Sequence, residues 1–441
     1  MQQDARHNGS RSARAAIASW MGTTIEWYDF FIYGTAASLV LGDLFFPSHV
    51  PGLSTMQALI TYGVGYVARP LGALMFSNLG DRMGRKQSLV LTLLMMGAAT
   101  FIIGCLPTYE TIGIWAPILL IAMRIVQGLA AAGEWGGAAL MSIEHAPSGR
   151  KTLFGSFVQL GSPCAALLAS LAFFLVSKFG PEAFKDWAWR LPFLLSVLLV
   201  VIGLWIRFNV EESPEFQKSK ATKDLAETPL LEVLRNHHKQ ILISSGVNFL
   251  GIGGIFIVTL YVMLVYAQQL GYSRSLSLSA GVILSLCSIV TFPVWGILGD
   301  RFGCRKVAIV GTIYTLIMVF PMFWLVSSRN EILFLAAAPL CFLGAGASYA
   351  VNAAITASMF PARVRYSGIS IGYQFSAILA AGPAPALSAW MVSKAGGAYW
   401  PVAAYLIAMC VITLVALLAL PKFSEMRSEG RHSIAASSTS L

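Results

Sequence analysis

The chain has 441 residues, of which 56% are hydrophobic and 11% are charged, and its mean hydropathy is +0.70. A soluble protein of this length needs a far more charged surface, so the composition excludes a soluble globular protein and indicates a membrane protein. The formal net charge of +10 would suit a nucleic-acid partner, but the basic residues gather in short segments between long apolar stretches.

Twelve apolar stretches follow one another, each long enough for a hydrocarbon core that needs about 20 helical residues. We therefore predict an all-α membrane protein with twelve transmembrane helices in two pseudo-symmetric six-helix bundles. The predicted helices lie near residues 16–42, 55–79, 87–106, 114–143, 152–177, 190–208, 241–268, 276–298, 306–327, 332–359, 367–393 and 399–420. The expected domains are a tail over 1–14, a bundle over 15–210, a linker over 211–240, a second bundle over 241–421 and a tail over 422–441.

The distribution of positive charge predicts the orientation of the chain. An even number of spans places both termini on one side of the membrane. The connections on that side, together with the two tails, carry 22 of the 30 Lys and Arg residues, and the opposite connections carry six. Positive residues favour the cytoplasmic side, so we expect cytoplasmic termini and a cytoplasmic linker. The expected macromolecular environment is the lipid bilayer, with no nucleic-acid partner.

One short phrase occurs twice, over residues 79–86 and 298–306, and its two aspartates are 219 residues apart, about half of the chain. A glycine permits the tight turn between two helices, and each aspartate is placed to bind a neighbouring helix N-terminus or an arginine. Duplication at matching points predicts a latch between the halves, with a plain topology signal as the alternative. We expect Asp81 to contribute more than Asp300, because Cys304 is inserted in the second copy. The predicted latch residues are Asp81, Arg82, Arg85, Asp300, Arg301 and Arg305.

Ionisable side chains inside predicted spans are the best pointers to function, because they are costly in a membrane. All of them lie in the N-terminal half, as Arg69, Arg124, Glu26, Asp29 and Glu134. An arginine near the midplane suits a substrate carboxylate, and a partly desolvated carboxyl group suits a coupled proton. The alternative is that these charges only pair with one another to hold helices together.

These considerations define the candidate site. Neutral polar residues near the charges, and others in the C-terminal half, complete the set that we expect to contact substrate. The predicted substrate-binding residues are Arg124, Arg69, Gln127, Tyr33, Asn352, Tyr373 and Gln374, and the predicted proton-coupling residues are Glu26, Asp29 and Glu134.

A series of phrases runs in order over residues 22–30, 68–72, 124–128, 133–137, 189–193, 212–216 and 365–368, in addition to the two hairpins at 79–86 and 298–306. The hairpins resemble the loop motif of the major facilitator superfamily. The phrases resemble its metabolite–proton symporter family, which includes shikimate, dicarboxylate, citrate and proline/betaine carriers. The sequence departs from the family at Ser77, where a glycine is usual. The resemblance implies a monomeric proton symporter of a small organic anion, working by alternating access in a bacterial-type inner membrane, with the proton as coupling ion and no cofactor.

Other classes of protein find less support. The sequence contains no G-x-S-x-G, H-E-x-x-H or P-loop phrase, so we do not expect an enzyme, and its scattered cysteines suggest no metal site. A channel would not need a duplicated latch. The runner-up is a facilitator-type uniporter or a proton antiporter for a sugar or drug-like solute, since residues 212–215 echo the sugar-porter phrase. Among organic anions, a cyclic or aromatic mono- or dicarboxylate is favoured.

Overall fold

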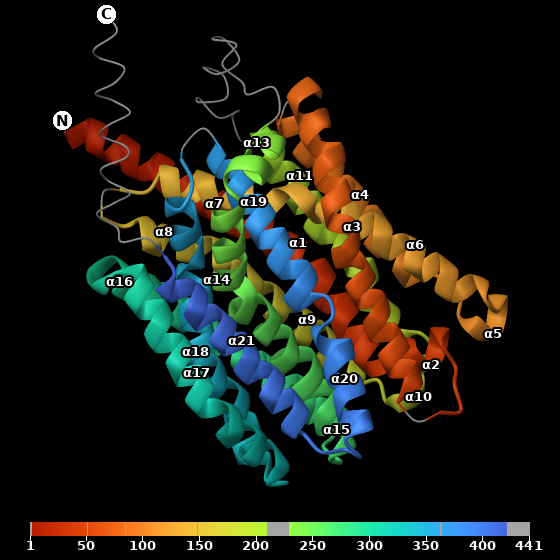
Figure 1. Ribbon diagram of the computed structural model, residues 1–441. Coiled ribbons are helices and arrows are strands. Elements are labelled where there is room, and N and C mark those ends of the chain that lie inside the picture. Colours follow the sequence, from red (N-terminus) through yellow and green to blue (C-terminus); the bar gives the residue numbers. More distant parts are fainter. Residues whose placement is uncertain are drawn as a thin grey trace, which may run out of the picture.

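The computed structural model describes residues 2–50, 52–83, 85–147, 149–209, 229–361 and 364–420, and the regular elements in them are helices. Long helical rods run side by side (Figure 1). The start of α1 and the short helix α13 (Pro229–Asn236) lie at one end of the bundle, here named the α13 end. Helices α2 (Gly42–Phe45) and α10 (Pro181–Asp186) lie at the other, the α2 end. In the described residues, nine helices are long and apolar enough to cross a membrane, and Val90–Cys105 is a shorter apolar helix.

The N-terminal half contributes six long helical segments, here called rods, some of which consist of two or three consecutive helices. They are α1 (Gln2–Ala36) with η1 (Ala37–Leu41) and α2; α3 (Leu53–Met83); α4 (Arg85–Cys105); α6 (Trp115–Ala130) with η2 (Ala131–Gly133) and α7 (Glu134–Glu144); α8 (Lys151–Gln159) with α9 (Gly161–Ser177); and η3 (Ala188–Arg190) with α11 (Leu191–Asn209). The short helix α5 (Tyr109–Ile112) precedes α6. Helix α1 packs against α7, α9 and α11, and α3 packs against α6, which brings the charged side chains of α1, α3 and α6 together.

The C-terminal half repeats this plan. Its rods are α14 (His238–Phe256) with η4 (Ile257–Tyr266) and α15 (Ala267–Gln269); α16 (Arg274–Phe302); α17 (Cys304–Ser327); α18 (Glu331–Ser358); α19 (Arg365–Ser376) with η6 (Ala377–Ala381) and α20 (Ala384–Lys394); and α21 (Trp400–Leu418). Gly303, at a φ of 96° that suits glycine, forms the predicted tight turn between α16 and α17. Helix α13 falls within the predicted linker and packs against α14 and α19.

The two halves meet at the α2 end through irregular parts of their rods. The segments η1, η4 and η6 are π-helical, a local geometry that is often found at functional sites. Segment η1 packs against η4, and α3 packs against η6 and α20. A Cβ atom on Gly63 would lie 3.0 Å from the carbonyl oxygen of Gly382. The backbone of α3 is therefore in contact with the backbone just after η6. The two halves are therefore in close contact at this end.

The two halves also meet at the α13 end, where α8 and α9 pack against α16 and α8 packs against α18. A Cβ atom on Gly296 would lie 2.5 Å from the hydroxyl oxygen of Ser156, and one on Gly299 would lie 2.5 Å from a methyl carbon of Thr152. Glycine at both positions lets α16 cross α8 closely. The two halves are therefore in contact at both ends of the described helices, with buried polar side chains between them.

Candidate functional site

A buried ion pair lies at the centre of the interface. Glu26 on α1 and Arg69 on α3 are 3% and 1% exposed, and Arg69 Nη2 lies 3.9 Å from Glu26 Oε1. The Arg69 guanidinium also lies over the rings of Phe30 and Tyr66, at 4.4 and 4.5 Å from their centroids. Nevertheless, Nε and Nη2 of Arg69 make no hydrogen bond to any described residue. Arg69 therefore has donor capacity that its surroundings leave unused.

Arg124 on α6 is buried in a different way, because each of its three side-chain nitrogens donates a hydrogen bond. Its Nη1 donates to Gln127 Oε1 at 2.8 Å, its Nη2 donates to the Tyr62 carbonyl at 2.8 Å, and its Nε donates to the Thr61 carbonyl at 3.4 Å. The guanidinium also lies 4.1 Å from the centroid of the Tyr33 ring. This arrangement ties α6 to α3 and α1. The predicted contact of Arg124 with substrate stays a prediction.

Gln127, Tyr33 and Asp29 belong to the surroundings of Arg124. Gln127 donates from Nε2 to the Thr100 hydroxyl at 2.7 Å, and the Tyr33 hydroxyl shares a short hydrogen bond with Thr61. The carboxyl group of Asp29, 3% exposed, lies beside Thr100 and within electrostatic range of Arg124. Asp29 therefore belongs to the electrostatic surroundings of Arg124, whereas Glu26 and Arg69 form an ion pair.

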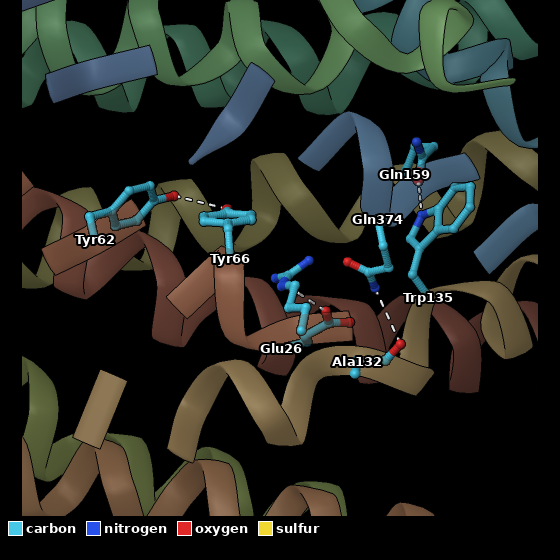
Figure 2. Close-up of polar contacts among 8 residues, drawn as sticks. Glu26, Tyr62, Tyr66, Ala132, Trp135, Gln159 and Gln374 are labelled. Atoms are coloured by element: carbon cyan, nitrogen blue, oxygen red, sulfur yellow. Dashed lines mark hydrogen bonds and ion pairs between the residues drawn. The ribbon is translucent and has the colours of Figure 1, made fainter. Parts of the chain in front are cut away.

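The C-terminal half adds neutral polar groups to the central ion pair. Tyr349 on α18 and Tyr373 on α19 are buried with their hydroxyl groups facing one another, and Tyr373 lies within electrostatic range of Arg69 and Glu26. Neither hydroxyl has a hydrogen bond of normal geometry among the described residues. Gln374 donates from Nε2 to the Ala132 carbonyl at 3.2 Å, which the 3₁₀ segment η2 leaves available, while its Oε1 accepts no bond there. Figure 2 shows Gln374 beside Glu26, between that residue and Trp135.

A chain of amide side chains connects the halves on the α13 side of the ion pair. Trp135 on α7 donates from Nε1 to Gln159 Oε1 at 2.8 Å, and Gln159 Nε2 donates to Asn352 Oδ1 at 2.7 Å. Asn352 Nδ2 then donates to Asn248 Oδ1 at 2.5 Å. The ring of Trp135 also stacks on that of Tyr373, with centroids 3.8 Å apart. Both ends of the Asn352 amide are thus occupied, so it joins helices rather than facing a solute in this arrangement.

An aromatic cluster closes the interface on the other side. Phe256, at the end of α14, packs among the rings of Trp27, Phe31, Tyr62 and Tyr66, with centroid separations of 5.4 to 6.1 Å. These four rings come from α1 and α3 of the N-terminal half. Figure 2 shows Tyr62 and Tyr66 on the opposite side of Glu26 from Trp135 and Gln159. The ion pair therefore lies between an aromatic barrier and an amide chain.

The second copy of the repeated phrase makes a contact between halves. Both carboxylate oxygens of Asp300, on α16, accept hydrogen bonds from the first turn of α8, from the Thr152 and Leu153 amides at 2.8 and 3.0 Å. An anion at a helix N-terminus is favourable there. The inserted Cys304 therefore leaves this contact intact.

The other predicted latch residues behave differently. Arg305 donates to the Leu418 carbonyl at 2.9 Å within its own half, and the Arg301 guanidinium lies 5.3 Å from the centroid of the Phe302 ring. The side chains of Asp81, Arg82 and Arg85 lie outside the described part of the structure, so their part in a latch stays a prediction.

Comparison with known proteins gives the family. Residues 15–242 match the family described as sugar (and other) transporter, and residues 243–439 match the major facilitator superfamily. The shikimate transporter of Escherichia coli (strain K12) is 38% identical over 414 residues, covering 93% of this chain and 94% of the relative. The chain belongs to the major facilitator superfamily. The same organism's inner membrane metabolite transport protein YhjE is 39% identical, covering 92% of this chain and 93% of the relative.

Further comparisons agree with a major facilitator transporter. The proline/betaine transporter of Salmonella typhimurium is 34% identical, covering 91% of this chain and 82% of the relative. The solved structure of the proton:xylose symporter XylE bound to 6-bromo-6-deoxy-D-glucose aligns with a TM-score of 0.73 at 17% identity, covering 93% of this chain and 95% of that one. This likeness confirms the twelve-helix, two-bundle fold predicted from the sequence. The protein is therefore a multi-pass membrane transporter of metabolites and not an enzyme, as predicted.

Within this major facilitator fold, the candidate residues separate into groups. Glu26, Arg69, Tyr373 and Gln374 meet at the centre, whereas Arg124, Gln127, Tyr33 and Asp29 form a cluster beside it. Asn352 belongs to the amide chain, and Glu134 begins α7 directly after the break at η2. Sequence reasoning missed Tyr66 and Gln159. Applying the rule for intramembrane charges to neutral polar residues as well would have found Gln159, a lone amide in an apolar stretch.

Proposed function

We propose that this transporter imports a small organic anion together with a proton, by alternating access, across a bacterial-type inner membrane. In this proposal both termini are cytoplasmic, the α13 end faces the cytoplasm, the proton is the coupling ion with no cofactor, and a monomer is sufficient. One observation carries it: a buried arginine, Arg69, has unused hydrogen-bond donors and lies 3.9 Å from a buried acid, Glu26.

The coupling follows from charge balance in a site of low dielectric. Ionised Glu26 and Arg69 together are neutral, so the empty site can close without burying a net charge. A substrate carboxylate on Arg69 makes the site negative unless Glu26 is protonated. A proton alone leaves the site positive. Only the empty carrier and the carrier loaded with both proton and anion are neutral, and these are the two states that reorient readily.

Transport by the purified protein tests this proposal. A thermal-shift screen against a panel of organic acids identifies a ligand, and proteoliposomes with an acidic exterior are then supplied with that ligand. We expect accumulation above the external concentration and its loss when a protonophore is added. Uptake that stops at equal concentrations would instead identify a uniporter, and accumulation under the opposite pH gradient would identify an antiporter.

Alternating access requires the Asp300 contact to break when the α13 end opens. Asparagine at this position keeps one acceptor oxygen but presents an amino group to the second backbone N–H. A charge-assisted hydrogen bond of about 1.5–3 kcal/mol is lost, enough to change the population of the open state about tenfold or more. We expect Asp300→Asn to raise the rate at which a thiol reagent modifies Ala353→Cys, a probe position buried on α18 against Gly155 of α8.

Arg301→Gln is the matched control for Asp300→Asn, because Arg301 occupies the same helix end and packs on Phe302 of its own half. The control is expected to leave the labelling rate unchanged. Equal rates in Asp300→Asn and the parent, with both proteins folded, would reduce the repeated phrase to a topology signal.

The amide chain is a second closure at the α13 end. Gln159→Leu removes the hydrogen bonds that join Trp135 to Asn352 and leaves buried polar partners unsatisfied. We expect the ratio of closed to open states to fall by about 5- to 150-fold, corresponding to about 1–3 kcal/mol. The Ala353→Cys labelling rate measures this change. Thr356→Val is the control, since its hydroxyl bonds only to carbonyls of its own helix. A similar effect of both variants would mean that the chain only stabilises the fold.

A further inference from the structure

Helix α16 carries at each end a charge that its own dipole disfavours. Arg274 is its first residue, near the positive end of the helix dipole, and Asp300 lies in its last turn, near the negative end. Each charge therefore weakens the helix that carries it, and its favourable interactions have to come from elsewhere in the protein. For Asp300 the partner is the N-terminus of α8 in the other half.

Arg274 also has its partners in the N-terminal half, but at the α2 end. Its Nη2 donates to the Leu39 carbonyl at 3.3 Å, and its guanidinium lies 4.4 Å from the centroid of the Phe184 ring. Asp43 lies within electrostatic range. These three residues belong to η1, α10 and α2, and α2 and α10 lie at the same end of the bundle (Figure 1). One arginine of the C-terminal half thus joins three segments of the N-terminal half.

The surface that receives Arg274 is held together by contacts of its own. Lys185 Nζ lies 2.8 Å from Asp43 Oδ2, which ties α10 to α2 within the N-terminal half. Phe184 is buried and packs against Phe173 of α9, with ring centroids 6.3 Å apart. None of these contacts involves Arg274, so the surface can keep its shape when the halves separate.

We infer that Arg274 holds the two halves together at the α2 end, as Asp300 does at the α13 end, so that opening either end breaks one of the two contacts. The inference rests on the alternating access of the proposed function, and not on its substrate or its proton. Arg274 suits a contact that breaks in every cycle. Its Nε has no hydrogen-bond partner among the described residues, and its single bond to the neutral Leu39 carbonyl is weaker than a bidentate ion pair.

Cysteine labelling at both ends of the purified full chain tests the inference. Ser38→Cys places a thiol of similar size on η1, at a position that is 7% exposed and whose hydroxyl lies 3.5 Å from the Leu260 carbonyl of the other half. Ala353→Cys again reports on the α13 end. Arg274→Gln is expected to raise the labelling rate at Ser38→Cys about five- to tenfold, and to leave the rate at Ala353→Cys no faster than in the parent. Labelling of each protein without the probe is subtracted.

Lys185→Gln is the matched control, because Lys185 is a cation at the same end whose partner, Asp43, lies in its own half. We expect this variant to leave the labelling of Ser38→Cys unchanged. Arg274→Lys keeps the positive charge but loses the planar group over Phe184, so its labelling rate should lie between those of the parent and of Arg274→Gln. The lysine variant also provides the comparison if glutamine at this position prevents folding.

The outcomes separate a specific contact from a general loosening of the fold. Asp300→Asn should give the mirror result, with faster labelling at Ala353→Cys and no increase at Ser38→Cys. Equal labelling of Ser38→Cys in the parent and in both Arg274 variants would overturn the inference. Faster labelling at both probes, or an equal increase in Lys185→Gln, would overturn it too. Because labelling needs no substrate and no pH gradient, a failure of proton-driven accumulation would contradict the proposed coupling and leave this inference standing.

Discussion

Arg69→Lys is expected to raise the KM for uptake about tenfold or more, and Arg69→Gln is expected to abolish saturable uptake. Lysine keeps the positive charge beside Glu26 but loses the planar fork that binds a carboxylate through two parallel hydrogen bonds. It also loses the flat stacking surface that lies over Phe30 and Tyr66. Initial rates in proteoliposomes give the KM, and calorimetry with the same ligand separates binding from turnover.

Arg124→Lys is the comparison that makes the Arg69 experiment specific. The three hydrogen bonds of Arg124 go to Gln127, Tyr62 and Thr61, so its replacement should lower the melting temperature. The protein that remains folded should bind the ligand with unchanged affinity. The opposite pattern, with normal binding in Arg69→Lys and lost binding in a stable Arg124→Lys, would move the carboxylate site to Arg124.

Glu26→Gln is expected to abolish uphill accumulation while preserving exchange of labelled for unlabelled substrate. Glutamine has the shape of glutamic acid but takes up no proton. With the anion bound, the site of this variant is neutral and reorients, so exchange continues. Without the anion, the site carries the uncompensated charge of Arg69, and the return of the empty carrier slows. Counterflow measures the exchange, and uptake under an imposed pH gradient measures the accumulation.

Asp29→Asn shows which carboxyl group carries the proton. Asp29 lies beside Thr100 and Arg124 rather than in the pair with Arg69, so we expect this variant to retain accumulation. Exchange without accumulation in Asp29→Asn, combined with normal accumulation in Glu26→Gln, would assign the proton to Asp29. Normal accumulation in both variants would make Glu134 the next candidate.

The fold was predictable from the sequence because its strongest determinants are local. A bilayer sets the length of each apolar stretch, and the hairpin at Gly303 follows from a single residue that tolerates positive φ. The local helix geometry was harder to predict from the sequence. The π-helical segments η1, η4 and η6 lie within apolar runs that look no different from regular helix in the sequence.

The candidate site was predictable in its composition but not in its pairing. Arg69 and Arg124 are each a lone arginine in a predicted apolar span, and the hydrogen bonds of Arg124 to Gln127 and to two carbonyls of α3 distinguish it from Arg69. Asp300 was expected to bind a helix N-terminus or an arginine. Because α16 crosses α8, Asp300 accepts hydrogen bonds from the N-terminus of α8. Asn352 was predicted to contact substrate, yet its partners come from two other helices, and sequence periodicity carries no information about them.

Proton movement on addition of substrate tests the central claim most directly. Cells that produce the protein are suspended in weakly buffered medium, and external pH is recorded while the ligand found by thermal shift is added. Symport predicts an immediate alkalinisation that is absent in Glu26→Gln and in cells without the protein. Uptake with no pH change, or with acidification, would contradict the proposed coupling of the organic anion to a proton.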